Sequence, residues 1–213
     1  MLHRPMKRYS SIASPGPAAP ALAASDTDTP VVASPSAVSN AATAPSPPDR
    51  PTRLPGQPHD GTHDFEFVEG SWRVHHRRLH RPLSGSSDWY EFEGSAVERT
   101  LWDGRANFEE IEAELPTGRL RAVALRLYDP ASRQWSIHWS NSSTGTLDRP
   151  MIGEFRDGRG VFVCQEEFDG RSILQRFIWT SSAPDACRWE QAYSADCGAS
   201  WETNWIMEFT RDG

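Results

Sequence analysis

Residues 134–140 read Gln-Trp-Ser-Ile-His-Trp-Ser, and this stretch decides the fold class. Trp135, Ile137 and Trp139 fall on one face, while small or polar residues alternate with them on the other. A period of two is typical of a β-strand with one buried face. The same alternation is expected near the C-terminus at Trp201, Thr203, Trp205, Met207 and Phe209.

Short runs rich in β-branched and aromatic residues continue along the chain. We find about ten: 71–80, 88–99, 106–114, 119–128, 133–141, 151–156, 160–168, 171–180, 187–194 and 200–210. Asp-Gly pairs at 103–104, 157–158 and 169–170 favour tight hairpin turns, and only 64–69 and 103–108 suit a helical turn. Strands joined by short turns pair antiparallel, and closing the sheet removes its exposed edges. The sequence therefore predicts an all-β fold, a single antiparallel up-and-down β-barrel.

The first 60 residues differ in composition from the rest of the chain. They hold 12 of the 17 prolines and one of the 22 aromatic residues (nine Trp, four Tyr, nine Phe). Such a segment buries too little apolar surface to offset the entropy of ordering it. We therefore expect a disordered Pro/Ala/Ser-rich tail over 1–60 and one folded domain over 61–213.

The charge of the domain argues against a nucleic-acid partner. The chain carries −7, and the tail, with five Lys/Arg against four Asp/Glu, contributes +1, which leaves −8 for the domain. Binding nucleic acid depends on neutralising phosphates, and no apolar run approaches the roughly 20 residues of a membrane span. Three cysteines without a CxxC pair fit a cytoplasmic protein. Secretion is the alternative, because basic residues precede an Ala-rich stretch that Pro15, Pro17 and Pro20 interrupt.

Two motifs at the ends of the domain resemble the calycin superfamily. Gly70-Ser71-Trp72 begins the first strand, and Phe209-Thr210-Arg211 ends the last. In calycins a late arginine covers the tryptophan of a Gly-x-Trp motif. The resemblance implies that Gly70, Trp72 and Arg211 close one end of a calycin-like barrel, since a guanidinium can stack on an indole while it donates hydrogen bonds.

Five longer segments resemble the bacterial domain-of-unknown-function family numbered 1579. They are HDFEFVEGSW at 63–72, LYDP at 127–130, QWSI at 134–137, RWEQAYS at 188–194 and WETNWIMEF at 201–209. The resemblance covers roughly 63–211 and implies a calycin-like barrel without an established activity. The chain departs from the family at Asp196-Cys197-Gly198, where members often have Asp-Gly-Gly, so Cys197 is not a family thiol.

Tryptophans and charged residues within the strands are the candidates for a ligand site. Five tryptophans are predicted to line a common lumen, with plain core packing as the alternative: Trp135, Trp139, Trp189, Trp201 and Trp205. Of these, Trp139, Trp189 and Trp205 are the candidate ligand contacts. A charge inside a barrel has to be paired or used, which makes Arg126, Arg176 and Glu190 candidate polar anchors and ion pairing across strands the alternative. A one-residue slip in register moves each candidate across the wall. Which strand faces point inward therefore stays open.

The sequence lacks the motifs of established catalytic sites. It has no nucleophile motif or Gly-rich phosphate loop, and His75 and His76 fall on opposite faces of a strand, so no metal site is expected. Whether the protein is an enzyme stays open. We expect a barrel without a cofactor that binds a small hydrophobic or aromatic molecule, and neither nucleic acid nor a membrane. The alternatives are a cofactor-free cyclase or isomerase with a pocket Glu as acid/base, a heme-binding barrel, and a structural or interaction barrel.

Overall fold

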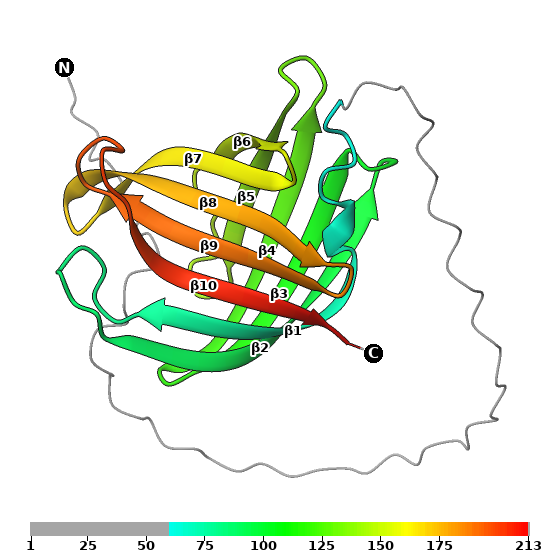
Figure 1. Cartoon of the computed structure of the whole chain (residues 1–213). Helices are drawn as coiled ribbons and strands as arrows, with labels where there is room; N and C mark the ends of the chain where they lie inside the picture. The colour runs from blue at the N-terminus through cyan, green and yellow to red at the C-terminus, as the bar shows by residue number, and fades with distance from the viewer. Residues whose placement is uncertain (1–59, 213) are drawn as a thin grey trace, which may run out of the picture. The chain divides into compact units, whose positions relative to one another are not determined.

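The computed structural model describes residues 60–212, so the predicted tail lies outside the described residues apart from Asp60. The described residues form one closed antiparallel barrel (Figure 1). Neighbours in the sequence are neighbours in the barrel, and β1 pairs with β10 to close it. This confirms the predicted fold class. The strands are β1 Gly70–Leu79, β2 Trp89–Leu101, β3 Ala106–Leu115, β4 Gly118–Asp129, β5 Gln134–Asn141, β6 Met151–Arg156, β7 Arg159–Phe168, β8 Arg171–Ala183, β9 Ala186–Ser194 and β10 Glu202–Arg211.

The Asp-Gly pairs make the predicted hairpin turns. Asp103, Asp157 and Asp169 have φ of 52°, 52° and 51°, and the glycine after each also has a positive φ. The helical turn expected over 103–108 is wrong, because Trp102 joins the turn with φ 54° and β3 already begins at Ala106. Consecutive residues of positive φ reverse the chain and are incompatible with a right-handed helix.

One end of the barrel is plugged by the segment that precedes β1. This segment contains the predicted helical turn, a 3-10 helix η1 at Glu66–Val68. The ring of Phe65 packs edge-on against Trp135 at 5.0 Å. The indole N–H of Trp135 donates to the carbonyl of Gly61 at 2.9 Å, and that of Trp72 donates to Val68 at 2.6 Å. Aromatic packing and hydrogen bonds together hold the plug and define the closed end of the barrel.

The alternation predicted over 201–209 holds only from Trp205 onward. A β-bulge between Thr203 and Trp205 shifts the register of β10 against β9. An extra residue in one strand turns the following side chains to the other face. As a result Asn204 and Trp205 are both buried, whereas Trp201 lies against Arg176, 4.1 Å from its guanidinium. The expectation that Trp201 shares a face with Trp205 is therefore wrong.

Candidate functional site

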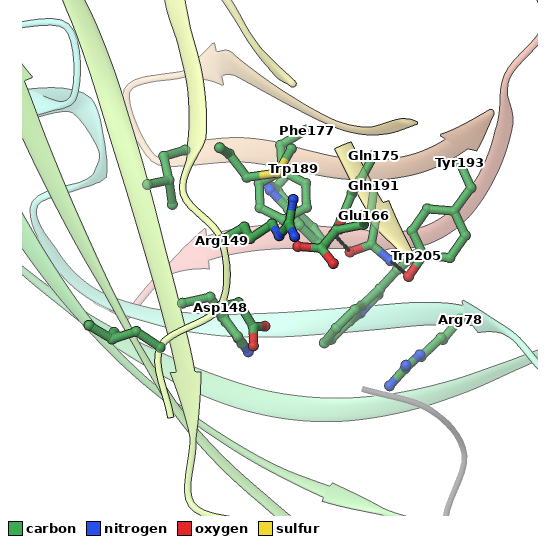
Figure 2. Close-up of a pocket in the computed structure, with 14 residues that line it drawn as sticks. Arg78, Asp148, Arg149, Glu166, Gln175, Phe177, Trp189, Gln191, Tyr193 and Trp205 are labelled. Carbon is green, nitrogen blue, oxygen red and sulfur yellow. Dashed lines mark hydrogen bonds between the residues drawn. The ribbon is translucent and has the colours of Figure 1, made fainter. Parts of the chain in front are cut away.

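A cavity of about 320 Å³ opens at the end of the barrel away from η1 (Figure 2). The two ends can be followed along β5, where Trp135 at the start contacts the plug and Trp139 near the end lines the cavity. The lining residues are Arg78, Ile137, Trp139, Leu147, Asp148, Arg149, Met151, Glu166, Gln175, Phe177, Trp189, Gln191, Tyr193 and Trp205. A volume of this size fits a small organic molecule.

Three indoles converge on this cavity from β5, β9 and β10. The ring of Trp205 lies 6.4 Å from that of Trp139 and 5.5 Å from that of Trp189, with interplanar angles of 81° and 87°. Phe177 on β8 packs on Trp189 at 4.8 Å. Perpendicular rings place ring faces and ring edges side by side, which suits packing against a flat apolar molecule.

A buried histidine fixes the orientation of Trp205. The indole N–H of Trp205 donates to Nδ1 of His76 at 3.2 Å. Because an indole nitrogen can only donate, Nδ1 must accept and the imidazole proton sits on Nε2. Burial, together with the positive charges of His75 and Arg78, lowers the pKa of His76 to about 3. His76 is therefore a neutral acceptor that positions an indole of the cavity wall.

Amide side chains form the polar part of the wall, next to the indoles (Figure 2). The amide nitrogen of Gln175 donates to the carbonyl oxygen of Gln191 at 2.8 Å. Gln191 in turn donates to Asn204 at 2.8 Å and to the hydroxyl of Tyr193 at 3.1 Å. The bulge in β10 is what brings Asn204 to the inside. This chain of neutral groups gives the cavity hydrogen-bonding capacity without net charge.

Two carboxylates lie at the rim of the cavity. Asp148 belongs to the connection between β5 and β6 and is held to β5 by its backbone N–H, which donates to the carbonyl of Trp139 at 2.9 Å. Glu166 lies in the inward row of β7 that contains the buried Phe162. Burial, followed by the charge of Glu166, raises the pKa of Asp148 to about 6. Arg149, the neighbouring cation, is exposed to solvent.

The structure brings Trp139, Trp189 and Trp205 together at the cavity, but the other two predicted lumen tryptophans are not cavity residues: Trp135 packs against the plug and Trp201 against Arg176. Arg176 and Glu190 are not cavity residues either. Trp189 faces inward, so the adjacent Glu190 lies on the outer face, where it accepts a hydrogen bond from Arg188 at 2.8 Å. Arg176 likewise faces outward between two cavity residues of β8. Successive side chains of a strand point to opposite faces, so Glu190 and Arg176 point away from the cavity when their neighbours Trp189 and Phe177 point into it.

Arg126 is inside the barrel but belongs to a buried ion cluster instead of the cavity. Its guanidinium donates to Glu98 at 2.5 Å and also to Glu109 and Asn107. The guanidinium also lies 4.8 Å from the ring of Trp179, among the large side chains of the closed end. Burial raises the pKa of Glu98 well above its usual range, and the charge of Glu109 adds to the effect while Arg126 opposes it.

The residues that the calycin resemblance assigns to barrel closure lie together. The guanidinium of Arg211 stands 4.2 Å from the ring of Trp72 and donates to the carbonyl of Glu69 at 2.7 Å. Gly70 has φ +120°, and a Cβ there would lie 2.5 Å from Nη1 of Arg211. Only glycine fits both this backbone conformation and the approach of the guanidinium.

The two rim carboxylates were missed by reasoning from the sequence. For Glu166 a signal exists, because it alternates with Phe162 and Phe168 in one strand and so shares their inward face. Asp148 carries none, since a loop residue has no periodicity that places it. In the same row of β7, burial and then the charge of Glu166 raise the pKa of the Cys164 thiol to about 12, which disfavours the thiolate form.

Comparison with known proteins gives similar folds and no family. No family model matches the chain, so the resemblance to family 1579 stays a prediction from its motifs. No curated protein matches either. An S-type phycobiliprotein lyase, CPES, from Guillardia theta is 14% identical over 70% of this chain and 90% of its own, with a TM-score of 0.46.

Two further solved structures are similar. Rv2717c from M. tuberculosis is 8% identical over 69% of this chain and 94% of its own, with a TM-score of 0.46. The protein EF1p2_mFAP2b bound to DFHBI is 10% identical over 71% of this chain and 99% of its own, with a TM-score of 0.40. Across residues 60–212, no three His, Cys, Asp or Glu side chains are placed to hold a metal ion, and no helix is long and apolar enough to cross a membrane.

Proposed function

We propose that the protein binds a small, flat, aromatic or apolar molecule in the cavity at the open end of the barrel. The observation that supports this is the convergence of Trp139, Trp189 and Trp205 on a space of about 320 Å³. A flat ring system would lie against the indoles, while the Gln175–Gln191 amides hydrogen-bond its polar edge. Ligand sites of this kind combine an apolar wall with a few placed polar groups.

Titration of the full chain with flat hydrophobic compounds, hemin included, tests the proposal. Binding beside the indoles is expected to quench or shift intrinsic fluorescence saturably at micromolar concentrations. Trp189→Ala and Trp139→Ala should each weaken binding measured by calorimetry. Trp102→Ala is the matched control, because Trp102 is 66% exposed on the β2–β3 turn and outside the cavity. If no compound binds at micromolar concentration, the structural or interaction role replaces this proposal.

Proton-transfer catalysis is the second candidate function, and one observation favours it. The sequence suggested a pocket Glu as acid/base, but the candidate Glu190 faces outward, and the carboxyl at the cavity is Asp148, with its pKa raised to about 6. A carboxyl that titrates near neutral pH can both give and take a proton. For any compound that binds, conversion to a product that is lost in Asp148→Asn while binding is kept would assign the protein to cyclases or isomerases.

A further inference from the structure

The four charged residues of the cavity differ in whether solvent or another side chain already stabilises their charge. The guanidinium of Arg78 lies 4.6 Å from the ring of Trp205, so this cation already has an aromatic partner on its side of the cavity. Arg149 is exposed, and a solvated charge contributes little to recognition. Asp148 and Glu166 are half-buried. Asp148 and Glu166 are therefore the charged groups of the cavity that have lost water contact and gained the least from other side chains in return.

Strand lengths explain why these carboxylates are neighbours. β6 is short and pairs with β7 only up to Val163, so the part of β7 beyond Val163, including Glu166, has no strand partner on that side among residues 60–212. β5 likewise pairs with β6 only at Trp135, Ser136 and Ile137. The connection that carries Asp148 is hydrogen-bonded to Trp139, in the part of β5 beyond its pairing with β6. Glu166 is close enough to Asp148 for its charge to shift the titration of that residue.

The partners of the two acids leave capacity for a ligand. Glu166 accepts one hydrogen bond, from the backbone N–H of Glu167 at 3.3 Å. Within residues 60–212 the carboxylate of Asp148 has no hydrogen-bond donor or ion-pair partner; its backbone N–H alone is engaged, with Trp139. A half-buried acid without a partner binds either a proton or a cation.

We propose that the ligand carries a basic nitrogen on its aromatic body, and that Asp148 together with Glu166 binds this ammonium or amidinium group while the indoles pack on the rings. The inference rests on the proposed binding function and names the ligand class for the same cavity. A cation at this rim gains charge-assisted hydrogen bonds from the acids and an attraction to the indole faces beside them. An aromatic anion held by Arg78 and Arg149 is the alternative ligand class.

Three compounds with one ring system and different charge separate these possibilities. We would measure binding of 2-naphthylmethylamine, 2-naphthylmethanol and 2-naphthoate to the full chain by calorimetry at about pH 8, above the pKa of Asp148 of about 6. The amine should bind roughly tenfold or more tightly than the alcohol, the factor expected of a charge-assisted hydrogen bond. Asp148→Asn should remove this advantage, because it weakens binding of the amine far more than binding of the alcohol, and Glu166→Gln should reduce it.

The controls keep failure of the inference apart from failure of the proposed function. Glu190→Gln removes a carboxylate of the outer face that is paired with Arg188, and should leave all three affinities unchanged. If the alcohol binds but the amine is no tighter, or if Asp148→Asn leaves the amine's advantage intact, the ligand class is wrong and the binding function stands. Tightest binding of the naphthoate would assign recognition to the arginines instead. If none of the three binds, both proposals fall.

Discussion

Replacing Glu98 by Gln should change how the stability of the barrel depends on pH. Glu98 and Glu109 share the single guanidinium of Arg126, and all three side chains are at most 2% exposed. With both acids ionised the cluster would hold one uncompensated negative charge away from water. Burial, reinforced by Glu109, therefore keeps Glu98 protonated and raises its pKa well above 4.5 in the folded protein.

The sign of the effect follows from the count of bound protons. Between the ordinary pKa of 4.5 and the raised folded value, the folded chain holds a proton at Glu98 that the unfolded chain has lost. Stability from this group is thus present at low pH and falls by about 1.4 kcal/mol per pH unit as the pH rises. This slope sets the upper bound of the loss from pH 5.5 to 7.5, which is about 3 kcal/mol.

Gln resembles the protonated acid in shape but does not titrate, so Glu98→Gln should abolish this slope. We would measure the free energy of unfolding in urea at pH 5.5, 6.5 and 7.5 for both proteins. The variant should be close to the wild type at pH 5.5 and more stable than it at pH 7.5. Glu110→Gln is the control, because Glu110 is exposed in the same sheet and its partner Arg99 is at 3.7 Å. Parallel pH profiles for the wild type and Glu98→Gln would refute the reasoning.

Two further predictions concern the closed end and the tail. Trp72→Ala should lower the free energy of unfolding by roughly 3–5 kcal/mol as a large-to-small core change, and Arg211→Ala should lower it by less. The two effects should be non-additive, because the guanidinium stacks on the indole. A double-mutant cycle in urea that shows no coupling would remove the physical basis of the closing pair. Deletion of residues 1–58, which keeps the Asp60 carbonyl that accepts from Tyr128, should shift the thermal midpoint by no more than about two degrees. A larger shift would show that the domain boundary is misplaced.

The fold could be predicted from the sequence because its signals are local. The alternation within 134–140 and the Asp-Gly turns depend only on neighbouring residues, so both can be recognised in the sequence. Trp139, Trp189 and Trp205 could be proposed for one lumen since they lie on inward faces of strands that meet in a single barrel. A helical turn over 103–108 did not form, because Asp103 and Gly104 make the hairpin turn that this Asp-Gly pair favours.

The polar half of the site depended on register, which no local signal fixes. A shift of one residue in the register of β4, β8 or β9 would move Arg126, Arg176 or Glu190 to the opposite face of its strand. The bulge after Thr203 then placed Asn204 inside together with Trp205, which strict alternation forbids. Asp148 reaches the cavity only because β6 is short, a property of pairing between distant segments.

The short seam between β5 and β6 also sets where the barrel can give way. β5 meets β6 over three residue pairs, against ten between β1 and β2. The Ile137–Met151 pair at one end of this seam lines the cavity, whereas Trp135 at the other end contacts the plug. Sub-global opening begins where few hydrogen bonds have to break. Separation at the cavity end of the seam would admit or release a bound molecule while the closed end, held by Trp135, stays intact. Ligand exchange would then not require global unfolding, and the backbone amides near Ile137 and Met151 should exchange with solvent ahead of those at the plug.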